Sequence, residues 1–173
     1  MATNENGDFT VLGLGELVLR VNEMDPMLTF YSDRIGLRLL RRWEDEVAFL
    51  RVGPTVAGQM QTLTLFNSRK LSNFDGSGWT GCDAKRSTLH HFALTISVED
   101  YQSTAKALAL DHIRFSTAIH SWIGWRSIFL RDPEENTVEL VCYDPKIDRH
   151  ETYDYSRLYG DPDMPWDPAT INK

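Results

Sequence analysis

Glu16-Leu-Val-Leu-Arg-Val21 is repeated 75 residues later in the chain as His91-Phe-Ala-Leu-Thr-Ile96. Two more stretches repeat in the same order: Phe49-Leu-Arg51 returns as Phe129-Leu-Arg131, and Gln61-Thr-Leu-Thr-Leu65 returns as Asn136-Thr-Val-Glu-Leu140. The last pair is again offset by 75 residues, whereas the middle pair is offset by 80. A duplication at this period indicates two similar supersecondary units that bury their faces against each other.

The first copy is predicted to begin with a strand over residues 11–22. Asp25-Pro26 then opens a helix that ends at Gly36, since proline favours the first turn and glycine the C-terminal end. Apolar residues at helical spacing support that helix. Three strands are predicted to follow, at about 37–43, 46–52 and 59–66.

The second copy is predicted to follow the same order. It has a strand over 89–97, a helix over about 99–110 and strands around 113–119, 126–131 and 136–143. Asp132-Pro-Glu-Glu-Asn136 is predicted to be the turn between the last two strands, because Asp, Pro and Asn favour turns. Each copy is therefore expected to be a βαβββ module, and the fold class is α+β.

We expect a polar lead over 1–10 and one folded domain over 11–145, with modules at 11–66 and 89–143. A polar linker over 67–88 joins the modules, and a loop of that length is usually functional or partly disordered. Residues 146–173 form a proline- and aromatic-rich C-terminal arm. We expect this arm to wrap the surface or cross a dimer interface, and we predict a homodimer.

The composition excludes several functional classes. A net charge of −7 argues against nucleic-acid binding, and the short basic cluster of Arg38, Arg41 and Arg42 is either a local anion site or a solvated edge. The N-terminus lacks the apolar region of a secretory signal, and no apolar run reaches the length of a membrane span. Cys82 and Cys142 form no metal or disulfide motif, so we expect reduced thiols in a cytoplasmic protein.

The repeat brings four strand positions into equivalence: Glu16, Thr64, His91 and Glu139. If a pseudo-twofold axis relates the copies, these positions converge on one point. Charged residues within apolar strands are costly unless they are paired or bound to a metal. Glu16, His91 and Glu139 are good ligands for Fe²⁺, Mn²⁺, Ni²⁺ or Zn²⁺, and three protein ligands leave open positions as in catalytic sites.

Each of these residues also has a plainer interpretation. A glutamate near a strand end is usually solvated or ion-paired, and the His90-His91 pair alone is more often structural or on the surface. The duplicated placement is what favours the metal-site hypothesis.

Three motifs resemble the vicinal oxygen chelate superfamily, which contains glyoxalases, bleomycin-resistance proteins and extradiol dioxygenases. They are Phe30-Tyr-Ser-Asp-Arg-Ile-Gly-Leu37, Leu89-His-His-Phe-Ala93 and Phe129-Leu-Arg-Asp-Pro-Glu-Glu-Asn-Thr-Val-Glu-Leu140. The resemblance covers about residues 12–143. It implies that two modules related by pseudo-twofold symmetry form one curved mixed sheet around a metal, with Glu16, His91 and Glu139 at three ligand positions.

The chain also departs from the pattern of this family. Glyoxalase I members have His or Gln at position 16 and Glu at position 64, and most extradiol enzymes have His at position 16. Ser77 and Phe129 stand where extradiol enzymes tend to have an acid/base His and a Tyr. His120 matches a histidine found near the metal in many extradiol members, although a structural histidine at a strand end fits as well. Glu135 replaces the usual glycine of the turn, which should cost some stability if φ is positive.

The leading functional hypothesis is a metal-dependent enzyme that acts on a small substrate with two adjacent oxygens. The metal would grip both oxygens and stabilise an enolate or catecholate. Glu16 or Glu139 could act as a base, and His120 as an acid or base. Two alternatives stay open: a non-catalytic drug-binding dimer of the bleomycin-resistance type, and a scaffold whose polar trio is only a hydrogen-bonded network.

Overall fold

The structure is a computed structural model that describes residues 11–70 and 89–150. The chain forms two compact units, Met1–Gly81 and Cys82–Lys173. The predictions for the N-terminal lead, for most of the 67–88 linker and for most of the C-terminal arm concern residues outside the described ranges. Within those ranges, no helix combines the length and apolar character that crossing a bilayer requires.

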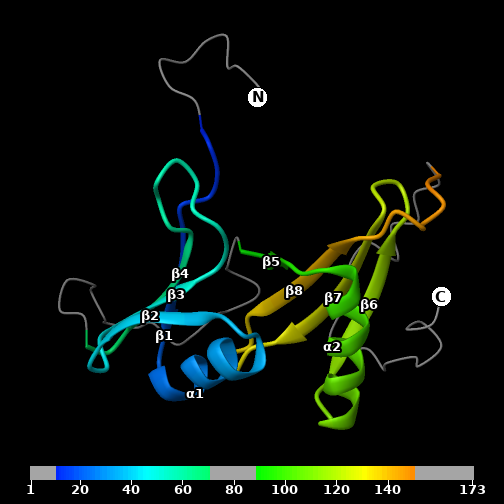
Figure 1. Ribbon diagram of the computed structural model, residues 1–173. Helices are drawn as coiled ribbons and strands as arrows, with labels where there is room; N and C mark the ends of the chain where they lie inside the picture. Colours follow the sequence, from blue (N-terminus) through cyan, green and yellow to red (C-terminus); the bar gives the residue numbers. More distant parts are fainter. Residues whose placement is uncertain (1–10, 71–88, 151–173) are drawn as a thin grey trace. The chain divides into compact units, whose positions relative to one another are not determined.

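The first module is a four-stranded mixed sheet with one helical segment (Figure 1). Its elements are β1 (Glu16–Val21), α1 (Met24–Thr29), a π-helical turn η1 (Phe30–Arg34), β2 (Arg38–Trp43), β3 (Val47–Arg51) and β4 (Thr62–Asn67). The strand order is β1-β4-β3-β2, with β1 parallel to β4 and the other pairs antiparallel.

The second module repeats this arrangement. Its elements are β5 (Phe92–Thr95), α2 (Val98–Leu110), β6 (Phe115–His120), β7 (Trp125–Arg131) and β8 (Thr137–Tyr143). The order is β5-β8-β7-β6, again with one parallel pair, β5 and β8. The predicted pair of βαβββ modules is confirmed, and each module forms its own mixed sheet.

Each sheet packs one face on its helix, and the opposite face carries both polar and aromatic side chains. In the first module, α1 contacts β4, and the apolar side chains of one sheet face are buried with those of the helix. This core contains Leu19, Val21, Met24, Met27, Leu50, Leu63 and Leu65. In the second module, α2 packs on β7 and β8, and the core contains Leu94, Tyr101, Leu108, Ile128, Leu130, Val138 and Leu140.

The strand alternation assigns the remaining side chains to the opposite faces. Glu16, Thr64, His91 and Glu139 all belong to the face of their sheet that does not carry the helix. We call these the polar faces of the first and second sheets.

Local chemistry explains several element ends. Ser97 caps α2, and its Oγ accepts a hydrogen bond from the backbone N–H of Asp100. Gly36 has φ of 85° directly after the helical turns, which is the conformation that glycine adopts most easily. Glu135 has φ of 67°, so this turn position has the positive φ under which the sequence predicts a cost in stability.

Two predicted boundaries were wrong. The first strand begins at Glu16 rather than residue 11, because the ladder with β4 begins at the Glu16–Thr62 pair. The predicted helix over 25–36 is divided into α1 and the π-helical turn η1.

Candidate functional site

In the first module, Glu16 is held by hydroxyl groups of the neighbouring strand. The parallel register sets Glu16 opposite Thr62 and Val18 opposite Thr64. Thr64 Oγ1 donates a short hydrogen bond to Glu16 Oε1, and Thr62 Oγ1 lies 3.4 Å from the same oxygen. Thr64 is fully buried, whereas Glu16 is exposed. The hydroxyl of Thr64 therefore fixes one oxygen of a carboxylate that solvent can reach.

In the second module, His91 and Glu139 are in direct contact. His91 Nε2 lies 3.0 Å from Glu139 Oε2. The other carboxylate oxygen, Oε1, accepts a hydrogen bond of 2.5 Å from Ser127 Oγ. Glu139 is only 6% exposed and Ser127 is fully buried. A buried carboxylate is costly without partners, and here both of its oxygens have one.

The two pairs occupy equivalent positions of the repeat. Glu16 contacts Thr64 across the β1–β4 pair, just as His91 contacts Glu139 across β5 and β8. Next to each pair is a phenylalanine of the adjacent strand, Phe49 opposite Thr64 and Phe129 opposite Glu139. The duplication seen in the sequence is therefore also a duplication of side-chain contacts.

Further contacts orient the ring of His91. Its Nδ1 lies 2.7 Å from Nδ1 of His90, and its ring meets Phe129 edge to face with 5.7 Å between centroids. A second hydrogen bond at a histidine fixes which nitrogen is presented to a neighbouring group. The edge contact with Phe129 limits rotation of the ring.

His120 belongs to the same sheet, at the end of β6, and is partly buried. Burial is the largest influence and lowers its pKa from the ordinary value of a histidine. The negative charge of Glu139 opposes this shift, and the positive form of His91 adds to it. The pKa of His120 therefore responds to both members of the His91–Glu139 pair.

Imidazole and carboxylate, the two donor types that meet in the second module, are both ligands that divalent metals accept. Two ligands that lie ~2.1 Å from a shared ion are ~3.0 Å apart at the right angle of octahedral coordination and ~3.4 Å apart at the tetrahedral angle. His91 Nε2 and Glu139 Oε2 are 3.0 Å apart, which matches the octahedral value and is also the length of a direct N–H···O hydrogen bond. Imidazole and carboxylate together suit Fe²⁺, Mn²⁺, Ni²⁺ or Zn²⁺. In residues 11–70 and 89–150, no three His, Cys, Asp or Glu side chains form a cluster that could hold a metal ion, and Glu16 belongs to the other unit. The full set of three ligands stays a prediction.

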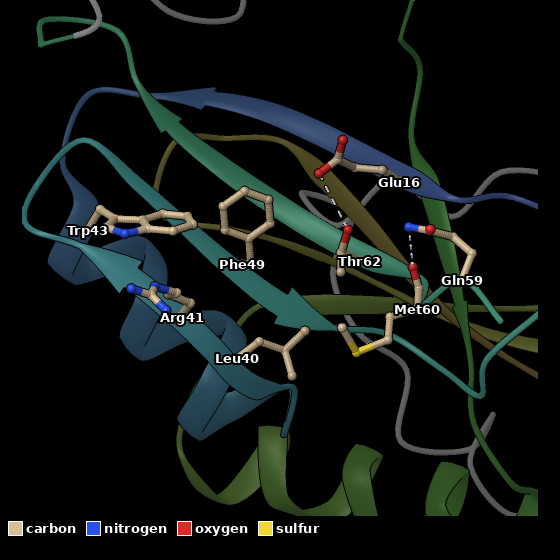
Figure 2. A pocket seen from close by; sticks show the side chains of 8 residues that line it. All are labelled: Glu16, Leu40, Arg41, Trp43, Phe49, Gln59, Met60 and Thr62. Atoms are coloured by element: carbon tan, nitrogen blue, oxygen red, sulfur yellow. Dashed lines mark hydrogen bonds between the residues drawn. The ribbon is translucent and has the colours of Figure 1, made fainter.

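A pocket of ≈ 290 Å³ adjoins Glu16 on the polar face of the first sheet (Figure 2). Its lining combines apolar and polar side chains: Glu16, Leu40, Arg41, Trp43, Phe49, Gln59, Met60 and Thr62. The rings of Trp43 and Phe49 meet edge to face at 5.4 Å between centroids. This volume is close to the lower end of the range of small-molecule sites, which is ~300–1,000 Å³.

Two tryptophans and two histidines of the second unit lie on its surface. Trp122 and Trp125 are exposed, as are His112 and His150. Ser127 was missed by the sequence analysis. Its position two residues before Phe129, on the strand that pairs with Glu139, was the one available signal.

Comparison with known proteins gives a family match over most of the chain. The model of the Glyoxalase/Bleomycin resistance protein/Dioxygenase superfamily matches residues 13–140. A search of curated proteins gives no match.

Solved structures support the same fold. A glyoxalase/bleomycin resistance protein/dioxygenase from Nocardioides aligns with a TM-score of 0.56 at 17% identity, covering 84% of this chain and 92% of that one. A domain of the same description from Frankia sp. EAN1pec aligns with a TM-score of 0.56 at 19% identity, covering 78% and 100%. Lactoylglutathione lyase from Agrobacterium tumefaciens aligns with a TM-score of 0.51 at 20% identity, covering 75% and 92%.

At these identities the structures establish similarity of fold. Together with the family match and the two βαβββ modules, they lead to one conclusion. The chain belongs to the glyoxalase/bleomycin resistance protein/dioxygenase superfamily.

Proposed function

We propose that this protein is a metal-dependent enzyme that acts on a small substrate with two adjacent oxygens. Glu16, His91 and Glu139 are the proposed metal ligands. The observation that carries the proposal is the 3.0 Å contact between His91 Nε2 and Glu139 Oε2. This contact lies at the positions of the repeat where the first module holds Glu16 against Thr64.

The proposed ligand set balances charge. Two carboxylates and one neutral imidazole neutralise a 2+ ion, and three protein ligands leave open positions for substrate. When bound, Fe²⁺, Mn²⁺, Ni²⁺ or Zn²⁺ would supply Lewis-acid polarisation of two adjacent substrate oxygens. Ser127 would hold Oε1 of Glu139, which keeps Oε2 directed at His91.

The chain offers two groups for proton transfer. Burial lowers the pKa of His120, so its imidazole is neutral near pH 7 and can accept a proton. Of the two carboxylates, Glu16 is the one that a substrate can reach, because its side chain is exposed. The buried Glu139 is better suited to a fixed ligand role.

Calorimetric titration of the metal-free protein tests this proposal. Zn²⁺, Mn²⁺, Ni²⁺ and, without oxygen, Fe²⁺ would be titrated into the wild type and into Glu16→Gln, His91→Gln and Glu139→Gln. At least one of these metals should bind to the wild type with a stoichiometry of one ion per chain. In each variant the metal affinity should fall further than the roughly 10–100-fold that is typical when a residue outside the ligand set is replaced.

Glu46→Gln is the matched control, because Glu46 is exposed and outside the proposed ligand set, and its replacement removes the same charge. Its affinity should equal that of the wild type. Equal affinity in Glu139→Gln, with the fold intact by circular dichroism, would show that the ligand assignment is wrong.

A non-catalytic small-molecule binder of the bleomycin-resistance type is the second candidate. The observation in its favour is Thr64, which occupies a fourth equivalent position with a hydroxyl that already bonds to Glu16. Such a protein would bind its ligand at full stoichiometry without metal and would turn nothing over. The predicted homodimer and cytoplasmic location are compatible with either candidate function. Sedimentation tests the first prediction and cell fractionation the second.

A further inference from the structure

Arg41 and Arg42 are neighbours in β2 with different environments. Arg42 donates to Asp25 at 2.7 Å and to Asp45 at 2.5 Å, so its charge is balanced within the protein. Arg41 lies over the ring of Trp43, with 4.7 Å from its guanidinium carbon to the ring centroid. Among the described residues, no carboxylate pairs with Arg41. Stacking orients the guanidinium plane and leaves its N–H groups for a ligand.

The pocket beside Arg41 has an aromatic wall. Trp43 and Phe49 meet edge to face, and Met60 and Leu40 complete the apolar lining (Figure 2). Trp43 is 46% exposed, although tryptophan is among the side chains most strongly stabilised by burial. Large apolar side chains that cluster at the surface beside a polar group are typical of ligand sites.

The repeat shows that the fold does not require these side chains. Arg41 pairs with Phe49, and the equivalent pair in the second module is Ser116 with Phe129. Trp43 is likewise replaced at the equivalent position by Ala118. The second sheet therefore forms with a hydroxyl and a methyl group at these two positions. The large side chains of the first sheet add a surface that the strand itself does not need.

We propose that this pocket binds aromatic carboxylic acids, with the ring against Trp43 and Phe49 and the carboxylate on Arg41. A planar carboxylate matches the paired N–H donors of a guanidinium. Glu16 lies apart from Arg41 in Figure 2, with Phe49 between them. The acid group thus points away from the carboxylate of Glu16, and the opposite edge of the ring is directed toward it.

This inference rests on the proposed function in one respect. It assumes that the pocket belongs to the same substrate site as the proposed metal, because Glu16 lines the pocket and is a proposed ligand. It extends that function by naming the substrate class. Ring binding in the first module does not itself require a metal, so it can be measured on metal-free protein.

The test is calorimetric titration of the full chain, after treatment with a chelator, with 2-naphthoate and with the neutral 2-naphthamide. The wild type should bind the acid more tightly than the amide. Arg41→Gln should weaken naphthoate binding at least about tenfold, because a hydrogen bond to a charged group is lost, and should leave amide binding unchanged. Trp43→Leu should weaken binding of both probes, since both stack on the ring.

Arg38→Gln is the control, because it removes the same charge from the same strand outside the pocket. It should change naphthoate affinity by less than about twofold, as expected for an exposed charge. Equal losses in Arg38→Gln and Arg41→Gln would overturn the proposal, as would equal affinity of wild type for acid and amide.

The outcomes separate the two proposals. Absence of naphthoate binding in a chain that holds metal would overturn the subsite and leave the proposed metal function standing. Arg41-dependent binding in a chain that holds no metal under any loading condition would support the subsite and contradict the metal-dependent enzyme.

Discussion

Replacement of Ser127 by alanine tests whether a buried hydroxyl holds the carboxylate of Glu139. Ser127 Oγ donates to Glu139 Oε1 at 2.5 Å, and no solvent reaches Ser127. Alanine keeps Cβ and removes one oxygen, so the cavity left behind is small. The main effect is therefore the loss of a hydrogen bond to a buried charged acceptor.

The magnitude follows from that loss. Hydrogen bonds to charged groups contribute ~1.5–3 kcal/mol, and the unsatisfied acceptor adds a desolvation cost of similar size unless it relaxes. Glu139 keeps its contact with His91, which limits this cost. We expect Ser127→Ala to lower the free energy of unfolding by about 2 kcal/mol. With a urea slope near ~2 kcal/mol per molar, the unfolding midpoint should fall by about 1 M.

The assay is urea unfolding followed by circular dichroism and tryptophan fluorescence, repeated in a Glu139→Gln background. If the hydroxyl acts through the carboxylate, the cost of Ser127→Ala should fall to half or less in that background. Ser103→Ala is the control, because Ser103 on α2 is exposed and, among the described residues, its hydroxyl bonds to backbone carbonyls alone. A loss below ~0.5 kcal/mol, or the same loss in both backgrounds, would refute the assigned role.

Three further predictions concern the second module. Asp132→Ala should lower the free energy of unfolding by ~2–4 kcal/mol, because this buried carboxylate accepts two backbone hydrogen bonds and one from the amide of Asn136. A melting temperature within about 2 °C of the wild type, which corresponds to a fraction of a kcal/mol, would contradict this. Glu135→Gly should raise the free energy of unfolding by up to ~1 kcal/mol, because φ is 67° at this position, and the melting temperature should rise with it. In an NMR titration, the His120 ring should have a pKa below the usual ~6.5. Glu139→Gln should lower this pKa further, because it removes a negative charge that stabilises the protonated ring. A higher pKa in that variant would contradict the electrostatic explanation.

The repeat explains why so much of the fold could be predicted. Alternation in Glu16–Val21 and again in 91–96 predicts strands with one buried face, and the Asp132 turn predicts the β7–β8 hairpin. Strand ends could not be predicted in the same way, because they depend on where a partner strand begins. The residues before Glu16 have strand-like composition but no place in the β1–β4 ladder.

The site was partly predictable for the same reason. Equivalence under the repeat selected His91 and Glu139, whose contact the structure then shows. The hydrogen bond from Ser127 and the stacking of Arg41 on Trp43 could not be predicted, because they depend on strand register and side-chain rotamers. Neither contact has a periodic signature in the sequence.

Elemental analysis of the purified, untagged protein tests most directly whether Glu16, His91 and Glu139 hold a metal. If they do, the wild type and Glu46→Gln should contain close to one Fe, Mn, Ni or Zn per chain, and Glu139→Gln should contain little or none. Full occupancy in a folded Glu139→Gln variant would contradict the account, as would a wild type that takes up no metal under any reconstitution.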